Sequence, residues 1–565
     1  MISVSKKDWS EKKVNQRLID KISQDNNFSS FLSKLIVSRN FNNEEIYSIN
    51  NNIEIINNFK KNNDFINASL LFENSIKKSE KICIFGDYDV DGSCASTLLI
   101  RFLKNISHPF LFYIPDREKD GYGPNPKILK KLLKKKPKLF IFLDCGSNSI
   151  DSIDFLNKNE IKSLIIDHHQ MYETFPKKNI IINPNKKSDY SIYNYLCATS
   201  LTYFFLKTVI DRKKIQNKFN LESYLILVLL ATVCDVMPIR NLNRTISINV
   251  LKNFSKYCYP GFKQISNFLL KNNKITIDDI GYLFGPILNS GGRLGFSHYA
   301  TELLSSDNNL KITKILNKLI FLNENRKIIE NKNLNEINFD KIYKQNNEIV
   351  FLYNPLFKDG LIGILAARVK EKVNKPSFVM TADESYIKGS ARSVIGFNVG
   401  KILNIALNKK IIIKGGGHQM AGGFLLKKEK IDIFKSFLNK EFKKNFKSKN
   451  NFQYDSKVSL SLKSDSFYED IDKLEPYGTG NSRPIFLIEN LRVKNPKVLN
   501  NKHIFNILIS NKGKSIPAIS FNSLKTKVGE YLLNFKKKLN VIGTLKYNYF
   551  NNKKKYQLII LDLIL

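Results

Sequence analysis

Cysteine is scarce and scattered in this sequence. The 565 residues contain six cysteines, and no two of them form a C-x-x-C pair. Small secreted proteins that depend on disulfides carry many cysteines at regular spacings, and that pattern is missing here. We therefore expect a reduced protein in the cytoplasm.

Long apolar runs are missing as well. The strongest one, LILVLLATVC at 225–234, leads directly into Asp235 and is much shorter than the roughly 18 apolar residues of a membrane-spanning helix. The first residues, MISVSKKDWSEKK, lack the apolar stretch of a signal peptide. These absences predict a protein without a membrane anchor.

Acidic residues are few in comparison with basic ones. The chain has 90 Lys and Arg against 51 Asp and Glu, which gives a net charge of +39. This excess suits a polyanionic partner such as nucleic acid. A second explanation is equally good, because Asn, Lys, Ile and Phe are abundant throughout, in runs such as NNIEIINNFKKNN at 51–63, and a charged run is usually a solvated surface. The net charge alone does not separate the two explanations.

The length and the hydrophobic content predict several folded domains. A chain of 565 residues with 42% hydrophobic side chains is too long for one core and too apolar for disorder. Between 81 and 167, the β-rich runs KICIFG, KLFIFLD and KSLIID alternate with helical patterns. This alternation predicts a parallel, doubly wound sheet in an α/β multidomain protein.

The pattern of the chain changes four times along its length. We expect an N-terminal helical segment at 1–75, a catalytic α/β domain at 76–306, a long connecting helix at 307–345, a second α/β domain at 346–450, and a C-terminal β-barrel at 451–565. The barrel is predicted from alternating runs such as RPIFLIENLRV and HIFNILIS, which turn residues separate within an all-β module.

The most informative segment is IFGDYDVDGS at 84–93, where an apolar strand ends in three aspartates at alternate positions, Asp87, Asp89 and Asp91. Alternate residues of an extended chain point to the same side, and facing carboxylates repel unless a cation lies between them. Oxygen ligands suit Mg²⁺ or Mn²⁺. An EF-hand calcium loop needs glutamate at its twelfth position, where this chain has Leu98. A surface acidic turn is the plainer alternative.

Acidic residues and histidines also follow other predicted elements. Asp144 ends one strand, and Asp167, His168 and His169 end another, at the edge of a parallel sheet where ligands bind. Asp235 follows the apolar run, where an unpaired charge is costly. Each residue alone has a structural explanation, such as helix capping. Four segments that agree favour a metal site.

These segments resemble a known family. GDYDVDG, LDCG, DHHQ and ATVCDVMPI, in this order, resemble motifs I to IV of the DHH phosphoesterases, and GGGHQMAGG at 415–423 resembles the glycine-rich signature of their second domain, DHHA1. Short members of the family have a histidine where this chain has Phe85. The form GDYDxDG, the run IPDREKDGYG, the length and the β-rich C-terminus are instead similar to the RecJ branch. That branch degrades single-stranded DNA from the 5′ end and has an OB-fold at its C-terminus.

The resemblance implies a set of metal ligands. They match five residues of this sequence: Asp89, Asp91, Asp144, His168 and Asp235. Asp144 is then the bridge between two ions, Mn²⁺ or Mg²⁺, and the implied reaction is phosphodiester hydrolysis by activated water. His169 and Asp87 are the other catalytic candidates, and His169 is expected to donate a hydrogen bond to the scissile phosphate or the leaving group.

The resemblance also implies a pocket for a 5′-terminal phosphate, since a guanidinium holds a phosphate through two hydrogen bonds. Arg117 and Arg392 match the phosphate-binding positions, with Ser390 beside them. Further substrate-binding candidates are Gly416, Gly417 and His418 of the glycine-rich run, where glycines let the backbone approach phosphates. Weaker candidates are Arg293, Asn243 and Arg244, for which a purely structural role is equally open.

Single-stranded DNA is the predicted partner. Phe505, Tyr547, Tyr549 and Phe550 alternate with lysines in the C-terminal module, as in surfaces that stack bases, although core packing explains any one of them better. The resemblance implies a monomer that acts in DNA recombination and repair with a helicase and a single-strand-binding protein. Two alternatives stay open: a DHH phosphodiesterase for short oligoribonucleotides or cyclic dinucleotides, and a non-catalytic DNA-binding relative. The second predicts eroded carboxylates, and here the motifs are intact.

Overall fold

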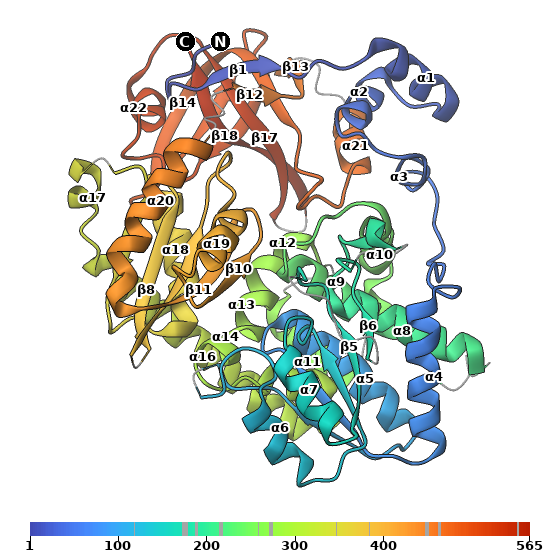
Figure 1. Cartoon of the computed structure of the whole chain (residues 1–565). Helices are drawn as coiled ribbons and strands as arrows, with labels where there is room; N and C mark the ends of the chain where they lie inside the picture. Colours follow the sequence, from blue (N-terminus) through green and yellow to red (C-terminus); the bar gives the residue numbers. More distant parts are fainter. Residues whose placement is uncertain are drawn as a thin grey trace. The chain divides into compact units, whose positions relative to one another are not determined.

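In the computed structural model the chain forms two compact units, whose helices and strands are labelled in Figure 1. Unit 1 contains Met1–Ile53, Ile239–Thr245 and Lys449–Leu565, and unit 2 contains Glu54–Pro238 and Ile246–Ser448. The structure describes residues 1–117, 119–171, 179–186, 190–213, 219–257, 259–270, 275–345, 347–383, 385–446, 451–460, 465–550 and 553–565, without the side chains of 383, 548–550, 553 and 554.

A parallel sheet forms the core of the first half of unit 2. Its strand order is β3-β2-β4-β5-β6, and every pairing is parallel. The strands are β2 (Ile82–Gly86), β3 (Phe110–Tyr113), β4 (Leu139–Leu143), β5 (Lys162–Ile166) and β6 (Ile180–Ile182). All residues of β2 and β4 are buried, as expected of strands that are covered on both faces. The three predicted strands are confirmed.

Helices cover both faces of this sheet. On one face, α6 (Pro126–Leu133) and α7 (Ile150–Lys158) share a core with Phe85 and neighbouring aromatic residues of β4. On the other face, Gly86 of β2 lies against Ser96 of α5 (Val90–Asn105), and α8 (Ala198–Lys213) packs on β4 and β5. The predicted doubly wound domain is confirmed.

A series of helices leads from this sheet to the second one. The longer ones are α9 (Leu225–Cys234), α10 (Asn241–Lys252), α11 (Pro260–Leu269), α15 (Tyr299–Ser305) and α16 (Asn309–Glu336), and the shorter ones include α12 (Ile277–Asp279), α13 (Gly285–Leu288) and α14 (Ser290–Arg293). A further helix, α4 (Asn63–Lys77), precedes the sheet. The connecting helix is α16, which ends before the predicted border. Asn338 accepts a hydrogen bond from the Lys341 amide, so it caps a separate helix, α17 (Phe339–Gln345).

The second half of unit 2 is a mixed α/β layer. Its sheet has the order β10-β11-β9-β8-β7, with β7 and β8 parallel and the other neighbours antiparallel. The strands are β7 (Val350–Tyr353), β8 (Ser377–Asp383), β9 (Tyr386–Arg392), β10 (Lys414–Gly417) and β11 (Ala421–Lys427). One apolar cluster joins the sheet to α18 (Asp359–Val373), and another joins it to α19 (Val399–Asn408) and α20 (Ile431–Asn445).

A closed barrel forms the C-terminal part of unit 1. Strands β14 (Ile485–Leu499), β15 (His503–Ile509), β16 (Ser515–Ser520), β18 (Lys553–Ile564) and β17 (Leu539–Phe550) follow one another around it, and β14 pairs with β17 to close it. The predicted OB-like barrel is confirmed, but the prediction of an all-β module is wrong. The module also contains α21 (Asp465–Lys473) and α22 (Lys527–Asn534), which pack on the barrel.

The N-terminal residues belong to the same unit as the barrel. The helices α1 (Gln16–Asn26), α2 (Ser30–Ser38) and α3 (Asn43–Tyr47) follow a strand, β1 (Asp8–Glu11), which pairs in parallel with β12 (Asn451–Tyr454). A further short strand, β13 (Ser456–Val458), pairs with β14. The sequence contains no signal for β1, because four residues with one apolar side chain show no periodicity.

The structure bears on two expectations, namely that the chain has no membrane-spanning helix and that its cysteines are reduced. Within the described ranges, no helix has the length and the apolar character needed to cross a membrane. Cys83, Cys94, Cys145, Cys197 and Cys234 are free thiols, while Cys258 lies outside the described residues.

Candidate metal and phosphate site

The topology of the first sheet brings the predicted ligands to one edge. From β2 the chain moves outward to β3, and it then returns to β4 on the other side of β2. The carboxyl ends of β2 and β4 are therefore a switch point of the sheet, where α/β proteins bind ligands. Asp87 follows β2, Asp144 follows β4, and Asp167 follows β5.

The first three aspartates are arranged differently from the prediction. They do not alternate along one extended strand, because β2 ends at Gly86 and Asp91 lies in the first turn of α5. Asp89 is the N-cap of that helix and accepts a hydrogen bond from the Gly92 amide at 3.0 Å. A Cβ at Gly92 would lie 2.5 Å from the Asp87 carbonyl oxygen, so only glycine lets the turn fold back this tightly.

The ligand atoms form three overlapping groups, in each of which they lie within 4.8 Å of one another: Asp87 with Asp89 and Asp144, Asp91 with His168 and Asp235, and Asp144 with His168 and His169. All five predicted metal ligands belong to these groups. Asp144 belongs to two of them, as a bridging ligand would. Asp87, predicted as catalytic, has the position of a ligand.

His168 connects the groups. Its Nε2 atom lies 3.6 Å from Asp91 Oδ2, 3.3 Å from Asp144 Oδ1 and 3.4 Å from Asp235 Oδ2. Burial, and then the charge of His169, lowers the pKa of His168 to about 4. The ring is therefore neutral near pH 7, and a neutral imidazole nitrogen is a metal ligand.

Burial makes the carboxylates of this site costly without a cation. Burial, followed by the charges of neighbouring aspartates, raises the pKa values of Asp87, Asp144 and Asp235 well above the usual range. The buried atoms Asp87 Oδ1 and Asp144 Oδ1 accept no hydrogen bond from the described residues. Hard oxygen atoms that lack donors, together with one imidazole, fit Mg²⁺ or Mn²⁺.

Asp91 is held by the start of α8. Its carboxylate accepts hydrogen bonds from the amides of Ala198 and Thr199, both at 2.8 Å, and from the Thr199 hydroxyl at 2.6 Å. The positive end of the helix dipole therefore faces the Asp91 carboxylate. Thr199 was missed in the sequence, because it lies more than a hundred residues from Asp91 in no recognised motif.

Asp167 orients the second histidine. Its Oδ1 atom lies 2.8 Å from His169 Nδ1 and accepts the His168 and His169 amides. Burial alone would lower the pKa of His169, but the charge of Asp167 and this hydrogen bond raise it to about 10. The Tyr122 hydroxyl lies 3.4 Å from His169 Nε2. Asp167 and Tyr122 occur in quoted motifs, but the sequence did not reveal these contacts.

Two residues of the site have a left-handed backbone. Asp144 has φ 61°, and Val236, next to Asp235, has φ 58°. For a β-branched residue this conformation costs about 1–3 kcal/mol, and such strain is concentrated at functional sites. Nothing in the sequence indicated it.

Three arginines gather within unit 2. Burial, and then the charge of Arg117, lowers the pKa values of Arg293 and Arg392, so the three guanidinium groups act on one another. Arg392 Nη1 lies 3.3 Å from Ser390 Oγ, and Arg117 lies over the Tyr88 ring at 5.5 Å. Arg293, a weaker candidate for substrate binding, is therefore within electrostatic reach of the stronger candidates Arg117 and Arg392.

The glycine-rich run forms the hairpin of β10 and β11. Gly416 and Gly417 lie in β10, and Gly417 has φ 152°. His418 lies at the exposed turn between the strands, and burial together with the charge of His169 lowers its pKa. His418 is therefore within electrostatic reach of the histidines of the metal groups.

Asn243 and Arg244, two further candidates for substrate binding, belong to unit 1. Arg244 is buried in unit 1, where it donates to the Leu474 carbonyl at 3.0 Å and lies over the Phe41 ring. Asn243 is buried beside it in the same unit. These contacts are those of structural residues, and a role in substrate binding stays a prediction.

The aromatic candidates of the barrel are half-buried where their side chains are described. Phe505 lies on β15, and the Tyr547 hydroxyl donates to Glu475 at 3.1 Å. The side chains of Tyr549 and Phe550 lie outside the described residues.

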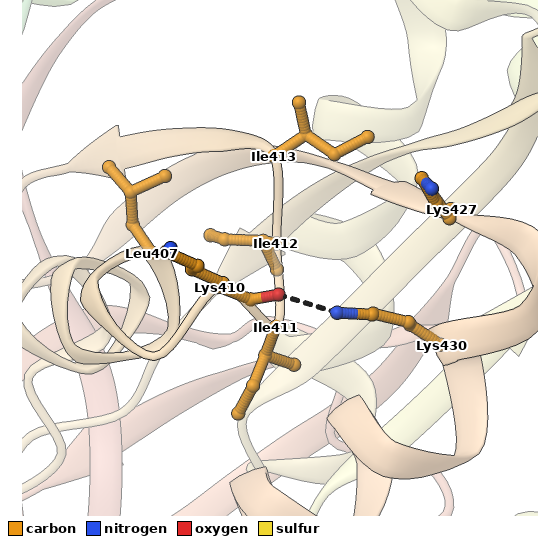
Figure 2. A pocket seen from close by; sticks show the side chains of 7 residues that line it. All are labelled: Leu407, Lys410, Ile411, Ile412, Ile413, Lys427 and Lys430. Carbon is orange, nitrogen blue, oxygen red and sulfur yellow. Dashed lines mark hydrogen bonds between the residues drawn. The ribbon is translucent and has the colours of Figure 1, made fainter.

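A surface hollow in the second half of unit 2 contains no predicted site residue. Figure 2 shows its lining of apolar side chains and lysines, where Lys430 donates to the Lys410 carbonyl at 2.7 Å. The lining residues are Leu407, Lys410, Ile411, Ile412, Ile413, Lys427 and Lys430.

Comparisons with known proteins agree with this architecture. The family model of the DHH family, N-terminal domain, matches residues 81–232, that of the DHHA1 domain matches 346–444, and that of the RecJ OB domain matches 454–562. The chain belongs to the RecJ branch of the DHH family. The metal groups lie in its DHH part or, for Asp235, just beyond the matched range, and Ser390, Arg392 and His418 lie in its DHHA1 domain.

Relatives of this RecJ-branch chain match between two thirds of it and nearly all of it. The single-stranded-DNA-specific exonuclease RecJ of Bacillus subtilis is 24% identical, over 99% of this chain and 71% of that protein. The RecJ of Haemophilus influenzae is 29% identical over 66% of this chain and 68% of its own length. The crystal structure of Thermus thermophilus RecJ in complex with Mn²⁺ has a TM-score of 0.82 at 19% identity, over 99% of this chain and 79% of that one.

Proposed function

We propose that this protein is a single-stranded-DNA-specific 5′→3′ exonuclease that releases 5′-mononucleotides by two-metal-ion hydrolysis and acts in DNA recombination and repair. The observation that carries the proposal is the set of three overlapping metal-binding groups, two of which contain Asp144, in one unit with a cluster of arginines. The names of the relatives support the same activity.

The chain offers two sets of metal ligands. Asp87, Asp89 and Asp144 would hold one Mn²⁺ or Mg²⁺ ion, and Asp91, His168 and Asp235 would hold the other. Asp144 Oδ1 lies 3.3 Å from His168 Nε2, so Asp144 would contribute its charge to both sets. When bound, such ions polarise the scissile phosphate and lower the pKa of the attacking water. Ala198 and Thr199 keep the Asp91 carboxylate oriented through hydrogen bonds from their amides.

His169 is the proton donor of the proposed mechanism. Asp167 keeps the ring oriented through Nδ1 and keeps it protonated at neutral pH. The other nitrogen, Nε2, lies near the Tyr122 hydroxyl and is left to donate a hydrogen bond to the scissile phosphate or the leaving oxygen.

Arg117, Arg392 and Ser390 give the reaction its polarity. A guanidinium binds two phosphate oxygens at once, and these side chains cluster with Arg293. We place the 5′-terminal phosphate at this cluster. The strand would then be unable to advance beyond it, and the phosphodiester bond at the metal-binding groups would be one near the 5′ end. His418 and the backbone of Gly416 and Gly417 contact the strand.

Several further properties belong to the same proposal. The protein acts as a monomer in the cytoplasm, with single-stranded DNA as its substrate and a DNA helicase and a single-strand-binding protein as partners. The domain borders 1–75, 76–306, 307–345, 346–450 and 451–565 also stay predictions.

End-labelled substrates test the activity. We expect the protein with Mn²⁺ to release labelled mononucleotide first from 5′-labelled single-stranded DNA, and to leave duplex DNA and RNA largely intact. Release from the 3′ end, or a preference for RNA dinucleotides, would contradict the proposal.

A variant of the bridging ligand tests the metal model. Asp144→Asn keeps a residue that tolerates the left-handed backbone but removes a charge that both ions need. Cleavage should fall at least about a thousandfold, on the scale of other essential catalytic groups. Strand binding, measured by fluorescence anisotropy, should change little. Cleavage at the wild-type rate would refute the two-ion arrangement.

A further inference from the structure

Asp359 is an acidic residue among the arginines and lies at the start of α18. Its Oδ1 atom lies 3.4 Å from Arg117 Nη2, and its Oδ2 atom lies 2.5 Å from Lys388 Nζ. One carboxylate therefore joins a cation from the first half of unit 2 to a cation from the second half. Its side chain is 14% exposed, so water weakens these ion pairs less than at an open surface.

The surrounding charge is strongly positive. Within the described part of the chain, Asp359 is the carboxylate that pairs with Arg117 and Lys388, and neither Arg293 nor Arg392 has an acidic partner. The four cations Arg117, Arg293, Lys388 and Arg392 have one carboxylate among them, so they repel one another unless an anion binds. Asp359 offsets part of this repulsion and leaves the remainder for a ligand.

The fold gives Arg117 few other supports. It lies in the irregular segment between β3 and α6, and its other described contact is the ring of Tyr88. A long side chain in such a segment has many rotamers to choose from. The ion pair with Asp359 selects the rotamer that points toward α18 and β9.

Neighbouring contacts bring the same turn of α18 to the other arginines. Arg293 Nη1 donates to the Gly360 carbonyl at 3.3 Å, and a Cβ at Gly360 would lie 2.2 Å from the Arg293 carbonyl oxygen. A Cβ at Gly363 would lie 3.3 Å from Ser390 Oγ and 3.4 Å from Arg392 Nη2. The start of α18, from Asp359 to Gly363, thus lies close to Arg117, Arg293, Ser390 and Arg392, and two glycines permit the approach.

We propose that Asp359 is a positioning residue, which fixes Arg117 and Lys388 at the spacing that the 5′-terminal phosphate requires and so sets the preference for phosphorylated ends. This inference rests on the proposed exonuclease function. Asp359 belongs to none of the metal-binding groups, so its loss should weaken the binding of the strand end and leave the chemical step nearly unchanged.

The test compares Asp359→Asn with the wild type on 5′-phosphorylated and 5′-hydroxyl single-stranded DNA. For the phosphorylated strand, KM should rise about tenfold, the scale of one charged hydrogen bond, while kcat stays within about twofold. For the hydroxyl strand, KM should hardly change. Asp359→Glu, which keeps the charge, should recover part of the preference.

Asp432→Asn is the matched control. Asp432 also lies in the first turn of a helix of unit 2, but its side chain is 88% exposed and it pairs with one lysine on its own helix. This variant removes the same charge from a helix start without touching the arginines. It should behave like the wild type on both strands.

Binding in EDTA gives a readout that does not depend on cleavage. The anisotropy of the two labelled strands should show the preference for the phosphorylated end in the wild type and its loss in Asp359→Asn. An unchanged preference in this variant overturns the inference, as does an equal fall of kcat on both strands with a lower melting temperature. A wild-type protein that removes no 5′ nucleotide instead overturns the proposed function.

Discussion

Asp87 and Asp144 are buried and Asp235 is half-buried, and each has its pKa raised by removal from water and by its neighbours. Such a group prefers to be protonated in the folded state. In the metal-free protein, the ionised carboxylates therefore destabilise the fold most above their raised pKa values. This cost decreases as the pH falls through those values and disappears below the ordinary pKa of aspartate. A bound cation relieves the same cost at neutral pH.

We predict that Mn²⁺ stabilises the protein more at pH 8 than at pH 5.5, because protons compete for the ligands at a higher pH than for ordinary aspartates. His168 is neutral at both values, since its pKa is lowered to about 4, and does not cause the difference. The melting temperature with and without MnCl₂ at each pH measures the effect. Asp144→Asn should lose most of the shift, and a shift that is equal at both pH values contradicts the prediction.

The strand β1 shows how one element depends on distant residues. Trp9, the only tryptophan, is buried and donates from Nε1 to Asp562 Oδ2 at 3.0 Å. Its ring packs with Tyr454, Leu487 and neighbouring apolar residues of the barrel. The first strand of the chain is therefore attached to the last one.

Replacing Trp9 should weaken unit 1. Trp9→Ala should lower the free energy of unfolding by about 3–5 kcal/mol, because it leaves a cavity. Trp9→Phe keeps a ring and should cost about 1–3 kcal/mol, since the buried carboxylate of Asp562 loses a donor. Calorimetry on the whole protein would show which unfolding transition the substitution shifts. Trp9→Ala with an unchanged thermogram would show that β1 does not stabilise the barrel.

At the scale of the whole molecule, unit 1 is assembled from three separate stretches of the chain. Leu32, Leu35 and Ile36 of α2 share an apolar cluster with residues of the barrel such as Phe486 and Leu508. Arg240, from the middle stretch, pairs with Glu45 at 2.7 Å. The barrel alone lacks these contacts.

We therefore predict that residues 449–565, expressed alone, fold poorly, and that co-expressed residues 1–53 improve their solubility and their NMR dispersion. The reason is the loss of the apolar cover that α2 and α3 provide. A fragment 449–565 that unfolds at the same temperature as unit 1 in the full chain would show that the barrel folds independently.

The sequence by itself determined the elements and the chemistry of the candidate site. β2, β4 and β5 are short apolar runs that a parallel sheet buries on both faces. The acidic motifs that follow them, through the family resemblance that they carry, predicted the five residues that the structure brings into the metal-binding groups. Local patterns of this kind can be recognised in a sequence, because residues that are close in sequence are also neighbours within a strand or a helix.

Only the tertiary structure decided which groups act together. Asp91 meets Thr199, and Arg117 meets Asp359, across more than a hundred residues of sequence, and β1 meets β12 from the other end of the chain. Such contacts depend on how the chain returns to itself, and no local periodicity records them. The backbone strain at Asp144 and Val236 likewise exists only because the surrounding fold holds it.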